Sequence, residues 1–252
     1  MPHTESNRPE RTAREHTRES KKLAPSCVVR DPINNRGMAD ELDGLKRMAA
    51  GSAVAQVASG MTVGLGTGST AEFVLLALAR RIREGLRITG VPTSERTAAR
   101  ARELGIPLTE LTGPIDIAID GADEVERGTL HLIKGRGGAL LREKIVAQAS
   151  ARFLVVVDHT KIVDHLGTAP LPVEIVPFGW QATARRIGVK FQRRDFITEN
   201  GNYILDCAFG PTLANELDRI TGVVEHGLFI GLTTEVHVGS PSGVQILRQL
   251  SK

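Results

Sequence analysis

The chain has 252 residues, of which 41% are hydrophobic, so it is long enough to form one large domain or two modest ones with a substantial core. Its net charge of +3 arises within residues 1–37, which hold eight Lys or Arg against five Asp or Glu, and the rest of the chain is neutral. A neutral body with only 4% aromatic residues argues against a nucleic-acid-binding protein and favours a small anionic ligand held by a few local groups.

The N-terminal segment, residues 1–37, is polar and has too few apolar side chains to offset the free-energy cost of ordering it, so we expect a disordered tail. A helical pattern begins after Met38, and we hypothesise that Met38 is the true start, which the intact mass of the native protein would decide. The segment lacks the apolar core of a signal peptide, and no apolar run approaches the roughly 18 residues that span a membrane. Cys27 lies in this segment, far from Cys207, so no disulfide is indicated and we expect a cytoplasmic protein.

Residues 39–167 alternate between helical and strand patterns. The expected elements are helix 39–59, strand 61–65, helix 71–83, strand 86–91, a helix ending at 104, strands 107–111, 115–119 and 131–133, helix 139–149 and strand 153–157. Strands that are followed by a glycine or polar turn and then by a helix form βα units. Apolar strands in such units are typical of a sheet covered on both faces, so we predict an α/β fold with a mostly parallel, Rossmann-like sheet.

The pattern changes after Gly167. The expected elements are strand 170–177, helix 180–187, a hairpin of strands 196–198 and 203–208, helix 211–220 and strand 223–230. This β-α-β-β-α-β order is that of a ferredoxin-like α+β module. We expect strand 235–238 and the segment 244–250 to return to the first sheet. The prediction is therefore a catalytic α/β domain of residues 38–167 and 233–252, interrupted by a ferredoxin-like domain of residues 168–232.

A glycine-rich turn, Gly66–Thr70, lies between the first strand and its helix. Its exposed backbone N–H groups, its hydroxyls and the positive end of the helix dipole could together hold a phosphate. The turn is neither a Walker A loop nor a dinucleotide-binding fingerprint, because it lacks the lysine of the first and the glycine spacing of the second. The alternative is an ordinary turn with a Ser or Thr helix cap, and the turn alone does not decide between the two.

The acidic residues that follow are each open to an ordinary interpretation. Asp120 begins an Asp-Gly turn after a strand, and Asp123 could cap a neighbouring segment. Glu143 lies off the helical arc of residues 141, 145 and 149, as a solvated surface charge would. His159, Asp164 and His165 lack a recognisable metal-ligand spacing, so no metal is expected.

The positions of these residues, taken together, support a functional site more strongly than any one of the residues does alone. Polar groups follow the carboxyl ends of five separate predicted strands, and these ends converge on one crevice in a parallel sheet. The five placements are Thr67 to Thr70, Ser94, Asp120 with Asp123, Lys134, and Asp158 with Lys161. We therefore predict one site that binds a small anion and carries carboxylates beside a lysine.

Several segments of the chain resemble those of a known protein family. The segments GLGTGST, DIAIDGADEVE, LIKGRGGALLREKIV, DHTKIV, PLPVEIVPF and GNYILD, in this order and spacing, are similar to ribose-5-phosphate isomerases of the A type from about Leu45 to the C-terminus. Residues 1–37 lie outside the resemblance. One departure concerns Arg136, where the family usually has a glycine.

The resemblance implies a metal-free, cofactor-free isomerase that interconverts ribose 5-phosphate and ribulose 5-phosphate through an enediolate, in the non-oxidative pentose phosphate pathway. It implies that Glu143 is the general base, that Asp120 and Asp123 handle hydroxyl protons and ring opening, and that Lys134 stabilises the enediolate oxygen. The implied substrate-binding residues are Gly66, Thr67, Gly68, Ser69, Thr70, Gly121, Ala122, Gly135, Gly137, Lys161, Lys46 and Ser94. It also implies a homodimer or homotetramer that binds a sugar phosphate and neither nucleic acid nor membrane.

Other protein classes share this kind of architecture. A regulator that senses sugar phosphates would keep the phosphate-binding turn, lack the acids and add a DNA-binding helix pair. An aminosugar-phosphate deaminase or a coenzyme A transferase would arrange its acids differently. The set of Asp120, Asp123, Lys134 and Glu143, together with the inserted module, favours the isomerase.

Overall fold

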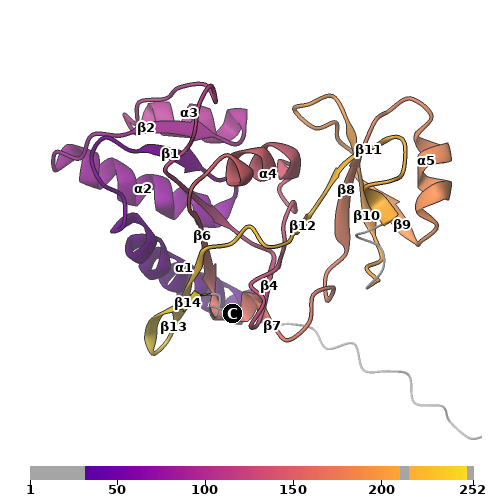
Figure 1. The fold of residues 1–252 in the computed structure, drawn as a ribbon. Helices are drawn as coiled ribbons and strands as arrows, with labels where there is room; N and C mark the ends of the chain where they lie inside the picture. Colours follow the sequence, from indigo (N-terminus) through magenta and orange to yellow (C-terminus); the bar gives the residue numbers. More distant parts are fainter. Residues whose placement is uncertain (1–31, 211–215, 249–252) are drawn as a thin grey trace, which may run out of the picture.

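The computed structural model describes residues 32–210 and 216–248, which form a large α/β domain beside a smaller α+β domain (Figure 1). The large domain is built on a six-stranded sheet of order β14-β13-β6-β3-β1-β2. Its strands are β1 (Thr62–Leu65), β2 (Thr89–Pro92), β3 (Ile117–Gly121), β6 (Phe153–Asp158), β13 (Glu235–Ser240) and β14 (Gly243–Arg248). All neighbours are parallel except the edge pair β13 and β14. The predicted Rossmann-like sheet and the return of the C-terminal segment to it are confirmed.

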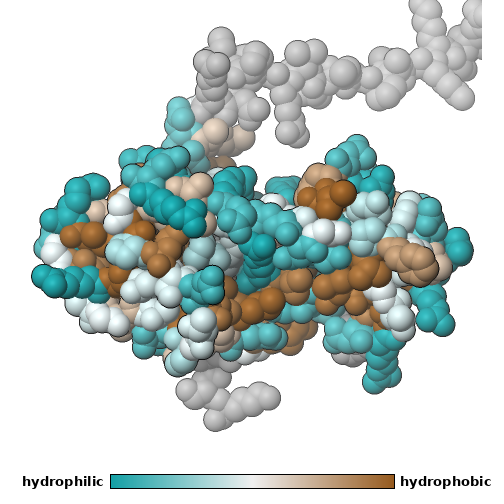
Figure 2. All heavy atoms as spheres, turned by 90° about the horizontal axis from the view of Figure 1, so that it is seen from above, coloured by the Kyte–Doolittle hydropathy of each residue, from teal (hydrophilic) through white to brown (hydrophobic). Residues whose placement is uncertain are grey.

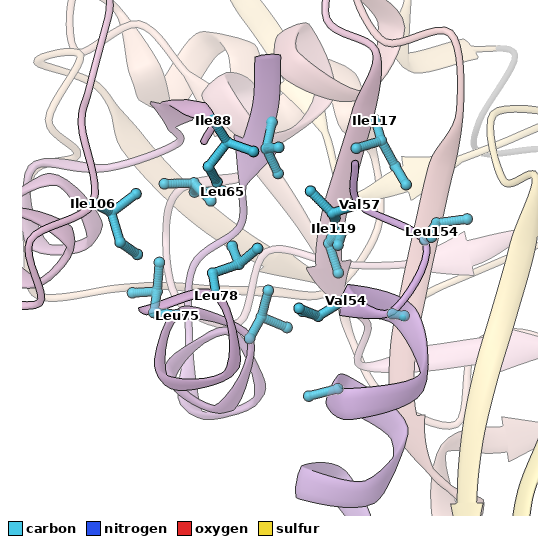
Figure 3. Close-up of a cluster of buried hydrophobic side chains, with 14 of the residues drawn as sticks. Val54, Val57, Leu65, Leu75, Leu78, Ile88, Ile106, Ile117, Ile119 and Leu154 are labelled. Carbon is cyan, nitrogen blue, oxygen red and sulfur yellow. The ribbon is translucent and has the colours of Figure 1, made fainter. Parts of the chain in front are cut away.

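Side chains alternate between the two faces of the sheet, as the pleat of a strand requires. In β3, Ile117 and Ile119 belong to one buried cluster and Ala118 to another, and in β6 Leu154 and Val155 divide in the same way. Both clusters are inaccessible to water, which is why the strands are almost continuously apolar. Figure 3 shows the first cluster, in which strand side chains meet those of two helices.

Helices cover both faces of this sheet. The first cluster contains buried residues of α1 (Pro32–Val54) and α2 (Ser69–Arg83), whereas α4 (Leu140–Gln148) contributes to the second. Helix α3 (Glu95–Glu103) follows β2. In the described ranges, no helix is long and apolar enough to cross a membrane.

A second, four-stranded sheet has the order β12-β5-β4-β7 and supplies part of the second cluster. Its strands are β4 (Glu124–Glu126), β5 (Leu132–Ile133), β7 (Ile162–Val163) and β12 (Leu228–Phe229), and the short helix η1 (His159–Lys161) precedes β7. Strand β4 starts immediately after Asp123, and β5 ends immediately before Lys134. This small sheet therefore holds two of the predicted site residues at the ends of its strands.

The small domain is an antiparallel sheet of order β11-β8-β10-β9 with helix α5 (Trp180–Ile187) packed against it. Its strands are β8 (Leu171–Ile175), β9 (Phe191–Arg193), β10 (Tyr203–Cys207) and β11 (Val223–His226). In order along the chain these are the first, second, third and fourth strands, so the first and third are central, as in a ferredoxin-like module. The predicted α+β module is confirmed. Its boundaries at residues 168 and 232 stay a prediction.

Several predicted elements differ from those observed. Helix α1 begins at Pro32, inside the segment assigned to a tail, and ends at Val54; proline is well suited to the first helical position. Residues 107–111 form one isolated bridge, Gly90 to Leu108, instead of a strand. The single strand expected over 223–230 is divided at Gly227 between two sheets. The predicted helix 211–220 lies largely outside the described residues.

The predicted strand 196–198 is wrong, because the partner of β10 is β9, over residues 191–193. Phe196 and Ile197 are exposed to 43% and 62% in a loop of residues 194–202. The loop is held by side chains: Thr198, Asn200 and Asn202 all donate to the buried carboxylate of Glu174, at 2.8, 3.2 and 3.0 Å. A local apolar pair thus resembles a strand without belonging to one.

Exposed aromatic side chains are found in the small domain, where Phe178 is 93% exposed and Phe191 41%. In the space-filling view, hydrophobic residues are visible over both domains (Figure 2). The homodimer or homotetramer expected from the sequence stays a prediction.

Candidate active site

A cavity of about 360 Å³ lies where the strand ends, the glycine-rich turn and the start of α4 meet. Three of the four predicted catalytic residues line it: Asp123, Lys134 and Glu143. Most of the predicted substrate-binding residues also line it, namely Lys46, Thr67, Gly68, Ser69, Thr70, Gly121, Ala122, Gly135, Gly137 and Lys161. Asp120, Gly66 and Ser94 lie behind this wall, and Arg136 forms part of it.

The glycine-rich turn presents the N-terminus of α2 to the cavity. The N-cap is Gly68, whose φ of 115° belongs to the region that favours glycine, and no side chain in the described residues caps this helix end. Ser69 is exposed and Thr70 half-buried on the first turn. The alternative of an ordinary Ser or Thr cap is therefore wrong, and the free N–H groups are available to an anion.

The hydroxyl of Thr67 points into a cluster of other hydroxyls. Its Oγ1 lies 2.7 Å from Thr93 Oγ1, 2.8 Å from Ser94 Oγ and 3.1 Å from Thr97 Oγ1. Ser94 is the N-cap of α3 and accepts a hydrogen bond from the Thr97 N–H at 3.1 Å. The cluster anchors the turn to α3, so Thr67 contributes its backbone and methyl group to the cavity, and Ser94 serves as a helix cap.

Asp120 is a buried carboxylate at the end of β3. Its Oδ1 accepts hydrogen bonds from the N–H groups of Thr67, at 3.2 Å, and Gly121, at 2.7 Å, and its Oδ2 lies 2.9 Å from Lys134 Nζ. A side chain at Gly66 would collide with this carboxyl, which explains the glycine there. Burial raises the pKa of Asp120, against the opposing effect of Lys134.

Lys134 is the buried cation of the site. Its Nζ donates to the Gly121 carbonyl at 2.5 Å, pairs with Asp120, and lies 3.4 Å from Glu143 Oε2. The ring of Phe229 is 5.6 Å away, on strand β12. Burial alone would lower the pKa of Lys134, but the carboxylates of Asp120 and Glu143 raise it well above its usual value. The lysine is therefore permanently charged.

Glu143 lies in the first turn of α4, and its carboxyl is 4% exposed yet faces the cavity. Its Oε2 accepts no hydrogen bond from the described residues, in spite of its burial. Burial raises the pKa of Glu143 to about 8, and the nearby Asp120 carboxylate adds to the effect while Lys134 opposes it. When ionised, a carboxylate with a free oxygen and a raised pKa is a stronger base than an ordinary carboxylate and is suited to take a proton from a substrate.

The arrangement of α4 contradicts the ordinary interpretation of Glu143 as a solvated surface charge. The buried positions are Leu140, Glu143, Lys144, Val146 and Ala147, while Ile145, on the arc expected to be buried, is 44% exposed. The helix packs its charged side against the small sheet and β11, where Lys144 Nζ donates to Glu225 at 2.6 Å. Because the buried charged side chains of α4 have partners in distant segments, the sequence of this helix shows no apolar periodicity.

Asp123 faces the cavity from the loop between β3 and β4. Its Oδ2 accepts a hydrogen bond from the backbone N–H of Arg136 at 3.0 Å. Arg136 has no backbone strain, because Leu130 is the single non-glycine residue with a positive φ in the described part of the chain. The position uses the backbone of Arg136 and leaves its side chain exposed at the edge of the cavity, so an arginine is accommodated where the resembling family has a glycine.

Two further lysines line the cavity. Lys46, on α1, pairs with Asp43 at 3.0 Å, and Lys161, on η1, has no ion-pair partner among the described residues. Asp158, which was expected to accompany Lys161, is buried and accepts hydrogen bonds from the N–H and hydroxyl of Thr160. The cavity is thus lined by cationic side chains, hydroxyls and helix N–H groups in addition to the candidate base and the buried cation. In the described ranges, no group of three or more His, Cys, Asp and Glu side chains is placed to hold a metal ion.

A reaction that used Glu143 as its base would depend on pH, because a carboxyl group accepts a proton only when it is ionised. We expect kcat/KM to rise with pH and to level off above about 8, the pKa to which burial raises this carboxyl. Initial rates from pH 6.5 to 9.5 would show this, since the phosphate group of a phosphorylated substrate is already ionised there, with its second pKa near 6. A flat profile over this range would contradict the assignment of Glu143.

Known proteins are similar to this chain over most of its length. The family described as "Ribose 5-phosphate isomerase A (phosphoriboisomerase A)" matches residues 89–243. Ribose-5-phosphate isomerase A of Gluconobacter oxydans is 55% identical over 219 residues, covering 79% of this chain and 94% of that protein. The structure of ribose 5-phosphate isomerase from Plasmodium falciparum has a TM-score of 0.80 and 38% identity, covering 83% of this chain and 100% of its own. A D-ribose-5-phosphate isomerase solved in complex with phospho-erythronic acid has a TM-score of 0.79 and 37% identity, covering 82% and 99%.

Proposed function

Since this chain belongs to the ribose 5-phosphate isomerase A family, we propose that it interconverts ribose 5-phosphate and ribulose 5-phosphate through an enediolate, with Glu143 as the general base. The observation that carries the mechanism is the pair formed by Glu143 and Lys134 at the wall of the cavity. A carboxyl oxygen without a hydrogen-bond donor lies 3.4 Å from a buried, permanently charged ammonium group. The base and the electrophile that an enediolate needs are thus adjacent.

In the aldose-to-ketose direction, Glu143 takes the proton from C2 while the electrons of that C–H bond form the C1–C2 double bond. The carbonyl oxygen on C1 becomes an oxyanion, and the ammonium of Lys134 stabilises it. Proton exchange between the two oxygens and return of the proton from Glu143 to C1 complete the ketose. The proton that leaves C2 is the one delivered to C1, so no co-reactant is needed.

The two aspartates take different parts in this proposal. Asp123 lines the cavity and is placed to exchange protons with substrate hydroxyls, including the one that opens the sugar ring. Asp120 lies behind the wall, so we assign it to holding Lys134 in place and to balancing its charge. This narrows the sequence-based expectation, in which both aspartates handled hydroxyl protons.

The phosphate end of the substrate would lie beside the cationic side chains of the cavity. The free N–H groups at the start of α2, the side chains of Ser69 and Thr70, and the ammonium groups of Lys46 and Lys161 all line it. Several donors with a helix N-terminus are the usual means of holding a phosphate. Binding energy from this remote group can then fix the reacting carbons beside Glu143.

An isomerase assay tests the proposal. We expect the purified protein to convert ribose 5-phosphate to ribulose 5-phosphate, and to do so equally well after treatment with excess EDTA, because Lys134 supplies the positive charge. Ribose without the phosphate is the matched control and should react with a much lower kcat/KM. Absence of turnover would favour the sugar-phosphate sensor, and loss of activity with EDTA would contradict the role of Lys134.

A further inference from the structure

Arg194 of the small domain reaches across to residues 135–138 of the active site, which we call the glycine loop. It follows β9 directly, and its side chain is 14% exposed. Its Nη1 donates to the backbone carbonyl of Gly135 at 2.9 Å and to that of Arg136 at 3.1 Å. Both of these residues line the cavity. One guanidinium group from the inserted domain thus holds two consecutive carbonyls of the catalytic loop.

The guanidinium is itself fixed by a second residue of the small domain. Its Nε and Nη2 donate to the two carboxylate oxygens of Asp206, on β10, at 2.8 and 2.6 Å. A bidentate pair of this kind sets the plane of the guanidinium as well as its position. The remaining nitrogen, Nη1, is therefore aimed at the loop by the sheet of the small domain.

The loop carries this constraint to Asp123. The N–H of Arg136 donates to Asp123 Oδ2, while the carbonyl of the same residue accepts from Arg194. The side chain of Arg136 is exposed, so the backbone of this residue is held mainly by these two hydrogen bonds. A shift of the loop would move the donor that orients the Asp123 carboxylate.

We propose that Arg194 is a positioning residue of the active site, which fixes residues 135–136 and through them the carboxylate of Asp123. This inference rests on the proposed function for the part that concerns Asp123, whereas the hold on the loop does not depend on it. In this proposal Arg194 contributes to catalysis from the small domain, although its own side chain does not line the cavity.

The test compares Arg194→Met with Arg193→Met. Arg193 is the adjacent arginine, and its guanidinium lies over the rings of Trp180 and Tyr203, at 5.4 and 4.7 Å from their centroids, away from the loop. Other contacts between the domains stay in both variants, including Arg142 with Glu199 at 3.0 Å. We expect Arg194→Met to lower kcat at least about tenfold with KM changed less than about twofold, because misplacement of a reacting group lowers the rate more than binding. Arg193→Met should leave both unchanged.

Two additional measurements separate positioning from loss of folding. Amide hydrogen exchange at residues 135–138 should be faster in Arg194→Met and unchanged in Arg193→Met, which needs no catalytic activity to be observed. Arg194→Lys should recover only part of kcat, because an ammonium group cannot hold both carboxylate oxygens and both carbonyls. Unchanged exchange in Arg194→Met would overturn the proposal, and so would faster exchange with an unchanged kcat. Absence of turnover in the wild-type protein would overturn the proposed function and the link to Asp123, with exchange still deciding whether Arg194 holds the loop.

Discussion

Replacing Glu143 with glutamine should lower kcat by about 10² to 10⁴-fold, the range by which a positioned general base accelerates proton transfer. An amide has the shape of the carboxyl group but cannot accept the proton from C2. The groups that we propose to bind the phosphate lie on α1, α2 and η1, so KM should change little. Steady-state kinetics with ribose 5-phosphate would measure both constants.

The same substitution should leave the protein folded. With a pKa raised to about 8, the carboxyl of Glu143 is largely protonated at pH 7, and glutamine imitates that neutral form. The melting temperature at pH 7 should therefore stay close to that of the wild type. Glu103→Gln, which removes an exposed carboxylate on α3, is the matched control and should keep full activity. A Glu143→Gln variant with near-normal turnover would remove this residue from the mechanism.

Replacing Lys134 with methionine should lower kcat by about 10² to 10³-fold, as the loss of one donor to a developing oxyanion does. The substitution also leaves Asp120 and Glu143 buried without their cation, which raises the pKa of both carboxyl groups further. The inflection in the pH profile of kcat/KM should therefore move above about 8. A carboxyl group whose pKa is raised in the folded state contributes stability to the protein that is lost as the pH rises through that pKa. The variant should therefore be least stable at alkaline pH.

Lys144→Met is the control for this experiment. Lys144 is also a buried lysine beside Phe229, with its Nζ 5.1 Å from the same ring, but it pairs with Glu225 and the His226 carbonyl outside the cavity. We expect a lower melting temperature, a loss in kcat of less than about tenfold, and no shift in the pH inflection. If both variants lost activity equally with the same pH profile, the loss would reflect packing around Phe229, and Lys134 would have no electrostatic role.

Much of the site could be predicted because its residues follow strand ends. The turn after β1, the acids after β3 and the lysine after β5 are local features of the sequence, and the parallel arrangement brings such ends together. What local pattern cannot show is how far each side chain reaches. Asp120 and Ser94 follow strand ends as predicted, yet both point away from the cavity toward partners within the wall.

The contributions of distant segments could not be predicted. Phe229, beside Lys134, and Arg194, which holds residues 135–136, come from the inserted region, and nothing in their local sequence indicates a contact with the site. The strand expected at residues 196–198 was wrong for a related reason. Two apolar residues between polar ones fit the pattern of a strand, but the buried Glu174 binds that segment as a loop.

The packing of α1 against β13 connects the two ends of the chain. Ser52 Oγ of the helix lies 2.9 Å from His237 Nδ1, and Gly239 has no side chain because one would collide with the Leu45 carbonyl. Lys46 is the first residue of the site to be synthesised, and the strand that seats its helix is among the last, after the whole inserted domain. A nascent chain that already contains Lys134 and Glu143 but not yet β13 therefore lacks part of the surface that holds α1, and the position of Lys46 in the cavity is completed only after residues 235–240 have been synthesised.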